Sequence, residues 1–316
     1  MPVPLNSTTA YPLCTVNKST RPLVAAKGTC TIYELELLNR PDNRLTPDFI
    51  NKSILPALDD IEEDWRAEAA SGGGQLFQGF DSANPAPLPR FDRRRVALLQ
   101  LLRLSPTDPA IRIASIRMAS WRFSMPVTVR LLDNRIPGLD FPLALRTPLF
   151  FPRILNALFA RFLTFPIPTI AAITGHAFAG GFTLALVHDY RIMKNQEAKK
   201  AIWLCMNEIF FGANIPQGMQ AVLKAKLPNA TVQRKVVLEG ARIGAPEALA
   251  TGIVDDLGAD GDDVVQKALT LAGQVSPLAK AKAWGLIKAG IHKQTIAELA
   301  TDRGNDGAGA DAVAKL

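Results

Sequence analysis

The fold is decided by the stretch P-T-I-A-A-I-T-G-H-A-F-A-G-G-F-T-L-A-L-V, which runs from Pro168 to Val187. Residues 169–174 predict a buried strand, and residues 177–188 predict a compact, nearly all-apolar helix. A helix that starts directly after a strand leaves its first backbone amides unpaired. Gly180 and Gly181 carry no side chains, so a resident anion or an oxyanion formed in a reaction can approach these amides closely. Glycines at such a turn also serve close packing, and the pattern alone does not separate the two roles.

Short apolar strands and amphipathic helices alternate on both sides of this stretch. Thr46 followed by Pro47 is a typical N-cap and first helical position, and it predicts a helix from there to about Ala70. Other strands are predicted at 29–38, 190–193, 201–206 and 253–257, and other helices at 150–165, 217–226, 231–238, 246–251, 262–274 and 277–300. This alternation predicts an α/β fold with a helical region at its C-terminal end.

The composition is that of a folded globular chain. Of the 316 residues, 48% are apolar and 21% are charged, which excludes a disordered chain, a collagen-like repeat and a small disulfide scaffold. Cys14, Cys30 and Cys205 form no C-x-x-C pair, which indicates a reducing compartment. We expect no metal site, because only three histidines are present, and no dinucleotide cofactor, because the glycine turn lacks the G-x-G-x-x-G spacing.

The positive charge of the chain is concentrated in one segment. Ten arginines and three acidic residues lie between Arg90 and Arg135, and their difference equals the net charge of +7 of the whole chain. No lysine occurs between Lys52 and Lys194. The segment is either a surface for phosphate, a polyanion or nucleic acid, or an arginine-rich insertion without such a role. The insertion is the simpler interpretation, and we expect no nucleic-acid partner.

Two segments have features of membrane or targeting signals. Residues 162–188 contain no Asp, Glu, Lys or Arg and are long enough to cross a bilayer, but prolines and glycines divide them into short pieces. We therefore expect no membrane span. The tripeptide Ala314-Lys315-Leu316 resembles the S-K-L class of peroxisomal address. It predicts a peroxisomal location and an import receptor as a partner.

Several short motifs follow the glycine turn in a fixed order. After P-x-I-A-A-x-x-G-x-A-x-A-G-G come D-Y-R-I at 189–192, N-E-I at 207–209, and A-P-E-A-L-A-T-G-I-V-D at 245–255. Upstream, residues 39–49 read N-R-P-D-N-R-L-T-P-D-F. In this order the motifs resemble those of the crotonase family, also called the enoyl-CoA hydratase/isomerase family. They extend over most of the chain from Thr29 to Asp255.

The resemblance implies an α/β fold built as a crotonase-like spiral of ββα units, with a C-terminal helical region that builds homotrimers or hexamers. It divides the chain into an N-terminal extension (1–24), an acyl-CoA-binding core (25–258), a helical region (259–300) and a flexible tail (301–316). Within the core, the arginine-rich segment at about 71–135 exceeds the family's usual spacing and is expected to be an insertion.

The resemblance also implies an acyl-CoA thioester whose carbonyl oxygen is held by two backbone amides. One amide is that of Gly180, in Ala179-Gly180-Gly181, and the other is that of Leu139 in the loop I-P-G-L-D. Coenzyme A is then part of the substrate, and no separate cofactor is implied. Further substrate-binding residues by position are Gly138, Gly181, Phe182 and Thr183.

A single carboxylate is expected to carry the proton chemistry. Hydratases of the family use two glutamates: the position of the first is occupied here by Thr183, and the second matches Glu208. One carboxylate suffices for a 1,3-proton shift, in which a base removes a proton from C2 of a 3-enoyl thioester and returns it to C4. Burial among Ile209, Phe210 and Phe211 is expected to raise the pKa of Glu208 towards neutrality, where a general base works best.

These features favour a Δ3,Δ2-enoyl-CoA isomerase-like enzyme of fatty-acid β-oxidation, which forms 2-trans-enoyl-CoA from 3-cis or 3-trans substrates. Peroxisomal isomerases of the family carry a similar single glutamate. Two alternatives stay open: an enoyl-CoA hydratase or other acyl-CoA enzyme of the same family, and a non-catalytic binder of acyl-CoA or RNA. A binder gains nothing from a buried carboxylate beside the glycine turn, so the position of Glu208 discriminates between an enzyme and a binder.

Overall fold

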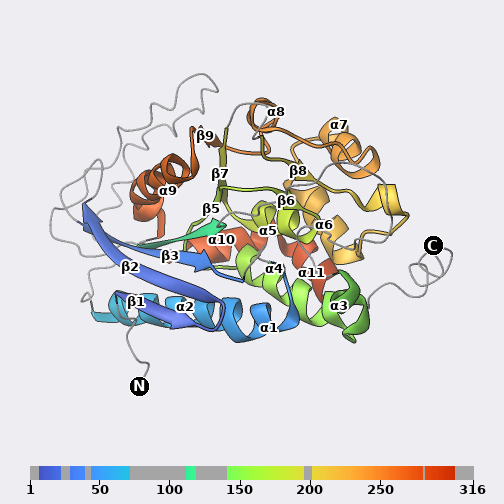
Figure 1. Ribbon diagram of the computed structural model, residues 1–316. Helices are drawn as coiled ribbons and strands as arrows, with labels where there is room; N and C mark the ends of the chain where they lie inside the picture. The colour runs from blue at the N-terminus through green and yellow to red at the C-terminus, as the bar shows by residue number, and fades with distance from the viewer. Residues whose placement is uncertain are drawn as a thin grey trace, which may run out of the picture.

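The structure, a computed structural model, describes residues 7–22, 29–39, 44–71, 112–118, 141–195, 201–279 and 282–302. Over these residues, the main sheet has seven strands in the order β1-β2-β3-β4-β5-β7-β9 (Figure 1). The pairs β1–β2 and β2–β3 are antiparallel, and the other neighbours are parallel. A small second sheet pairs β6 with β8 in parallel. The strands are β1 (Thr8–Tyr11), β2 (Cys14–Pro22), β3 (Thr29–Leu37), β4 (Arg112–Met118), β5 (Thr169–Ile173), β6 (Ala177–Phe178), β7 (Tyr190–Lys194), β8 (Leu204–Cys205) and β9 (Asp256–Gly258).

Helical segments connect the strands and complete the C-terminal region. The Thr46 hydroxyl accepts a hydrogen bond from the Phe49 N–H and caps the first helix, as the sequence predicts. The segments are α1 (Pro47–Phe49), η1 (Ile50–Ile54), α2 (Leu55–Ser71), α3 (Phe141–Arg146), η2 (Phe150–Leu155), α4 (Asn156–Leu163), α5 (Gly180–Val187), η4 (Glu208–Phe211), α6 (Gln217–Lys226), α7 (Ala230–Gln233), η5 (Arg234–Leu238), α8 (Ala245–Ala250), α9 (Gly261–Val275), η6 (Ser276–Ala279), α10 (Trp284–Ile291) and α11 (Lys293–Thr301).

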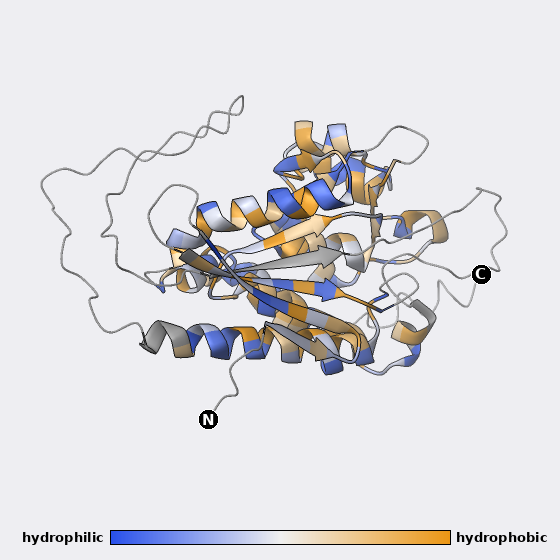
Figure 2. Ribbon diagram, turned by 60° about the vertical axis from the view of Figure 1, so that its left-hand side comes forward, coloured by the Kyte–Doolittle hydropathy of each residue, from blue (hydrophilic) through white to orange (hydrophobic). Residues whose placement is uncertain are grey.

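Helices cover both faces of the main sheet. α9 lies along one face and contacts β3, β4, β5, β7 and β9. Helices α2, α4 and α5 pack on the other face, so the strands form a layer between helices (Figures 1 and 2). In β5, Ile170 and Ala172 join the core under α9, while Ala171 and Ile173 join the larger core on the other side. This burial of both faces explains why β5 is apolar from Ile170 to Ile173, and it confirms the predicted α/β class.

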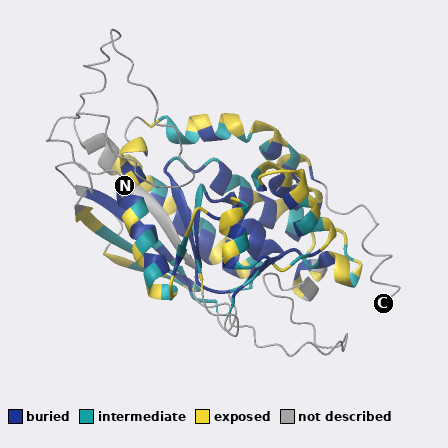
Figure 3. Cartoon of the chain, turned by 90° about the horizontal axis from the view of Figure 1, so that it is seen from above, coloured by how far each residue is buried: buried dark blue, intermediate teal, exposed yellow. Residues whose placement is uncertain are grey.

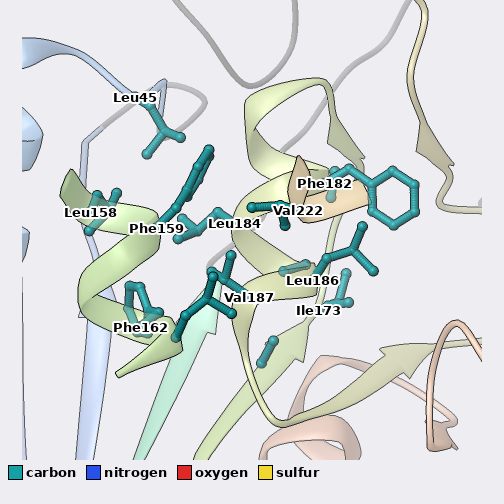
Figure 4. Close-up of a cluster of buried hydrophobic side chains, with 14 of the residues drawn as sticks. Leu45, Leu158, Phe159, Phe162, Ile173, Phe182, Leu184, Leu186, Val187 and Val222 are labelled. Atoms are coloured by element: carbon teal, nitrogen blue, oxygen red, sulfur yellow. The ribbon is translucent and has the colours of Figure 1, made fainter. Parts of the chain in front are cut away.

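Helix α5 lies in the middle of the larger core, and all eight of its residues are buried (Figure 3). Leu184 and Val187 of α5 lie against Phe159 and Phe162 of α4 (Figure 4). Close packing on every side leaves a helix few ways to move. The first turn of α5 is therefore held at a fixed place relative to the strands around it.

Two predicted elements differ from the observed ones. Ala177 and Phe178, predicted as the start of a helix, form β6 instead, because they pair with β8 about 27 residues further along the chain. The continuous helix predicted over 277–300 is divided into η6, α10 and α11. A local apolar pattern cannot show either a pairing with a distant strand or a break between two helices.

Two segments that the sequence places in an extension or an insertion form strands of the main sheet. Residues 8–22, which fall in the expected N-terminal extension, form β1 and β2. Residues 112–118, inside the expected arginine-rich insertion at about 71–135, form β4 between β3 and β5. β4 joins β3 to β5, and β1 and β2 extend the same sheet at one edge, so these strands belong to the core. Within the described ranges, no helix is long and apolar enough to cross a membrane.

Candidate active site

The small sheet brings the predicted oxyanion amide and the predicted base to the same edge. β6 and β8 run parallel, with Phe178 opposite Cys205. α5 begins at Gly180, just after β6, and the 3₁₀ helix η4 begins at Glu208, just after β8. Parallel strands end on the same side of a sheet, so Gly180 and Glu208 leave it from neighbouring points.

One residue, Ala179, makes the turn between β6 and α5. Its backbone has φ 49° and ψ −123°, a conformation that residues with a Cβ atom rarely adopt. The Ala179 N–H donates to the Cys205 carbonyl at 2.9 Å, and the Ala179 carbonyl accepts from the Thr183 N–H at 3.0 Å. The N–H of Ala179 therefore belongs to the strand pairing, and its carbonyl belongs to the hydrogen bonds of the helix.

The start of α5 has no side-chain cap. Its N-cap residue is Ala179, and Gly180 and Gly181 are buried residues without side chains. The first amides of a helix have no acceptor within the helix, and the helix dipole makes this end partly positive. Such an end favours a carbonyl oxygen that gains negative charge in a reaction.

Glu208 is a buried carboxyl group at the start of η4. Its side chain is 5% exposed, and among the described residues its Oε2 atom has no hydrogen-bond partner. Burial raises the pKa of Glu208 from 4.5 to about 7, and a backbone hydrogen bond opposes part of this rise. A carboxylate with this pKa accepts and returns a proton readily near neutral pH.

Two of the three apolar residues expected to bury Glu208 are themselves exposed. Ile209 is 51% exposed and Phe210 is 69% exposed, so these two side chains do not enclose the carboxyl group. Both lie against Gly240, where an added Cβ atom would come within 2.7 Å of Phe210 and 2.9 Å of Ile209. The raised pKa is confirmed as an effect of burial, but its assignment to Ile209 and Phe210 was wrong.

Thr183 lies one turn into α5 and is completely buried. Its hydroxyl donates to the Ala179 carbonyl at 3.2 Å. At the position where hydratases of the resembled family have their first glutamate, this chain therefore has a hydroxyl group that is used within the helix. Thr183 supplies no second carboxylate, as the sequence predicts.

The opposite end of α5 holds a buried network of charged groups. Asp189 Oδ2 accepts from the Lys288 ammonium at 2.8 Å, and from the N–H and hydroxyl of Thr169 at 2.8 and 2.9 Å. The Arg191 guanidinium donates to the carbonyls of Ile253 at 2.6 Å and His188 at 2.8 Å. The buried lysine of α10 thus ties the C-terminal region to the end of α5 and the start of β5.

This network was missed in the sequence because its members are far apart along the chain. Lys288 lies on α10, where the neighbouring Leu286, Ile287 and Ile291 are 78%, 63% and 73% exposed. A helix that buries its lysine and exposes its leucine and isoleucines reverses the usual pattern. The signal available in the sequence was the single lysine within the apolar run W-G-L-I-K-A-G-I.

Some predicted residues lie outside the part that the structure describes. Leu139 and Gly138, expected to form the second side of the oxyanion site, are among them, as are most of the arginine-rich segment and the tripeptide Ala314-Lys315-Leu316. Within the described ranges, no group of three or more His, Cys, Asp or Glu side chains is arranged to hold a metal ion.

About half of the chain matches known sequences. Residues 151–307 match the family model described as enoyl-CoA hydratase/isomerase. The chain is 36% identical over 140 residues to the peroxisomal enoyl-CoA delta isomerase 2 of Arabidopsis thaliana, which covers 44% of this chain and 56% of that protein. It is 31% identical over 158 residues to the peroxisomal enoyl-CoA delta isomerase 1 of the same plant, covering 48% and 64%. The matches thus span less than two thirds of these relatives.

Comparison with solved structures extends the likeness over nearly the whole fold. An enoyl-CoA hydratase/isomerase family protein from Pseudomonas syringae superposes with a TM-score of 0.59 at 18% identity, covering 95% of this chain and 98% of that one. An enoyl-CoA hydratase from Mycobacterium ulcerans gives 0.56 at 17% identity, covering 94% and 98%. At these identities the comparison establishes the fold, which is crotonase-like.

Proposed function

Because residues 151–307 place the chain in the enoyl-CoA hydratase/isomerase family, we propose that the protein is a Δ3,Δ2-enoyl-CoA isomerase. The observation that carries this proposal is the buried Glu208, whose Oε2 atom has no partner among the described residues, at the same sheet edge as the helix start at Gly180, which has no side-chain cap. The names of the Arabidopsis relatives, enoyl-CoA delta isomerases, support the same activity.

In the proposed reaction the Glu208 carboxylate removes a proton from C2 of a 3-enoyl thioester. The electron pair of the broken C–H bond forms a C1–C2 double bond, and the thioester oxygen becomes negative. The Gly180 N–H, with the Leu139 N–H that the family pattern implies, stabilises this oxyanion. Glu208 then returns the proton to C4, the double bond settles between C2 and C3, and the carboxylate is regenerated.

A paired assay tests this function. Purified protein is given 3-cis- or 3-trans-enoyl-CoA in one reaction and 2-trans-enoyl-CoA in another. Turnover of the 3-enoyl substrate without hydration of the 2-enoyl substrate is expected, because Thr183 leaves Glu208 without a second acid to activate water. Hydration as the dominant activity would favour the hydratase alternative, and acyl-CoA binding without either reaction would favour a non-catalytic binder.

The proposed assembly is a homotrimer or a hexamer. The exposed apolar side chains of α10, namely Leu286, Ile287 and Ile291, support it, because apolar groups gathered on one side of a helix favour contact with another protein surface. Light scattering at micromolar concentration should give three or six times the mass of the chain. A monomer under these conditions would exclude this assembly.

The proposed location is the peroxisome. Two of the Arabidopsis relatives carry the word peroxisomal in their names, which supports it. The expected address tripeptide Ala314-Lys315-Leu316 is tested by deleting it from a fluorescent fusion protein. Loss of peroxisomal fluorescence is expected, and unchanged import would show that these three residues are not the address.

A further inference from the structure

Ala179 has an unusual backbone for its residue type. Among the described residues, the non-glycine residues with positive φ are Leu149, Ala179 and Lys282. Leu149, with φ 61° and ψ 22°, lies in the left-handed helical region that such residues sometimes visit. Ala179, with ψ −123°, lies outside it, in a region typical of glycine at the first central position of a type II′ turn. The Cβ atom of Ala179 therefore makes this turn unfavourable.

The strain allows an abrupt change from strand to helix. A residue that precedes a helix normally has an extended backbone and a polar side chain that covers the first amides. Ala179 has neither, and its N–H is still part of the β6–β8 pairing through the Cys205 carbonyl at 2.9 Å. The amides of α5 consequently begin where β6 ends, beside the end of β8 that leads to Glu208.

Both sides of the strained residue are held by hydrogen bonds. The Ala179 carbonyl accepts from the Thr183 N–H at 3.0 Å and from the Thr183 hydroxyl at 3.2 Å. In a planar trans peptide the carbonyl and the following N–H point in opposite directions. Holding the Ala179 carbonyl along the helix therefore directs the Gly180 N–H out of the helix start.

We propose that Ala179 is a positioning residue, which holds the Gly180 N–H towards the substrate carbonyl through its strained backbone. The inference rests on the proposed function and adds a role that the family pattern does not give to this residue. Glycine would adopt the same turn without strain, but it would also allow the peptide to rotate, because glycine has many more accessible conformations. The Thr183 hydroxyl is a second restraint on the same peptide.

The test compares Ala179→Gly with Lys282→Gly, which relieves positive φ at an exposed residue before α10. For Ala179→Gly we expect kcat with 3-enoyl-CoA to fall by roughly tenfold or more, since complete loss of one oxyanion donor costs ~10²–10³ in rate. The KM of Ala179→Gly should stay close to that of the wild type. Its thermal unfolding midpoint should stay the same or rise. Lys282→Gly should leave kcat unchanged. Thr183→Val should lower kcat by less, and Thr183→Ser should restore it.

A spectroscopic readout separates this inference from the proposed reaction. The infrared band of a ¹³C-labelled carbonyl in bound, saturated acyl-CoA reports how strongly amides polarise it, and it needs no turnover. We expect a lowered frequency in the wild type and a frequency near that of the free thioester in Ala179→Gly.

Each outcome of these measurements decides one of the two proposals. A band that is the same in Ala179→Gly and the wild type, or an unchanged kcat, overturns the positioning role, as does a wild-type band at the free-thioester frequency. A lowered wild-type band without any isomerisation would overturn the proposed function alone. Failure of acyl-CoA to bind would overturn both.

Discussion

The two ends of α5 treat buried polar groups in opposite ways. At the carboxyl end, Asp189 Oδ2 has three donors, from Lys288 and from two groups of Thr169. At the amino end, Glu208 is buried, but its Oε2 has no partner among the described residues, and the helix has no side-chain cap. Burying a carboxyl group is favourable only when it is paired, so the amino end lowers the stability of the fold.

This difference separates the parts of the molecule that stabilise it from the part that reacts. At the carboxyl end, hydrogen bonds between groups of the protein itself join α5, β5, β7 and α10. The amino end combines a base whose Oε2 has no partner among the described residues, a helix start without a side-chain cap, and a strained Ala179. Sites that violate local rules of stability are where function is expected, because substrate binding supplies the missing partners.

The largest effect on stability is expected at the paired end. Lys288→Met keeps the apolar part of the side chain but leaves Asp189 without its buried cation, which should lower the free energy of unfolding by about 4 kcal/mol. The matched control is Lys267→Met, which removes a half-exposed pair with Asp256 at 3.2 Å and should change stability by about 1 kcal/mol or less. Urea unfolding of both variants and the wild type measures the difference. Equal effects of the two substitutions would show that the network at the end of α5 contributes no more than a surface pair.

At the amino end of α5, a substitution of the buried carboxyl group is expected to raise stability. Burial raises the pKa of Glu208 from 4.5 to about 7, so the wild type loses stability as the pH rises through this interval, whereas Glu208→Gln does not titrate. The free energy of unfolding of the variant should therefore exceed that of the wild type by an amount that grows between pH 4.5 and 7. At pH values above 7 this difference should be about 3 kcal/mol. Urea unfolding at pH 5 and pH 8 checks this. A variant that is less stable than the wild type at pH 8 would mean that Glu208 is stabilised by partners in the fold.

The smallest effect is expected when a second acid is added at the amino end. Thr183→Glu introduces a carboxyl group at a completely buried position one turn into α5. It restores the two-acid arrangement of the family's hydratases, and we expect a weak hydration of 2-trans-enoyl-CoA that the wild type lacks. Thr183→Gln, of nearly the same size, is the control. Hydration by both variants, or by neither, would remove the second carboxylate as the cause of the difference between the two activities.

The sequence predicts the elements of this fold better than their contacts. The strand before Gly175, the cap at Thr46 and the helices on either side follow from local patterns, and the family resemblance adds the positions of Gly180 and Glu208. The pairing of β6 with β8 and the contact of Lys288 with Asp189, 99 residues apart, depend on the folded chain. The first of these contacts brings together the strand ends that lead to Gly180 and Glu208, and the second holds the opposite end of α5.

The strained turn and the surroundings of Glu208 were also beyond a local pattern. Alanine favours helices, and the sequence Ala179-Gly180-Gly181 does not predict a positive φ at the alanine. Ile209 and Phe210 are apolar neighbours in sequence, but they turn towards Gly240 and solvent. The burial of a side chain depends on the tertiary packing around it, which adjacent residues alone do not determine.

Turnover of 3-enoyl-CoA by Glu208→Gln is the most direct test of the claim that the amino end of α5 is a reaction centre with a single base. The substitution keeps the size of the side chain but cannot accept the proton, and loss of a general base typically lowers the rate by ~10²–10⁴-fold. Acyl-CoA binding, measured separately by calorimetry, should stay near the wild-type value. The account predicts at least a hundredfold fall in kcat with intact binding. Turnover near the wild-type rate with intact binding would contradict it, because the site would then have no base.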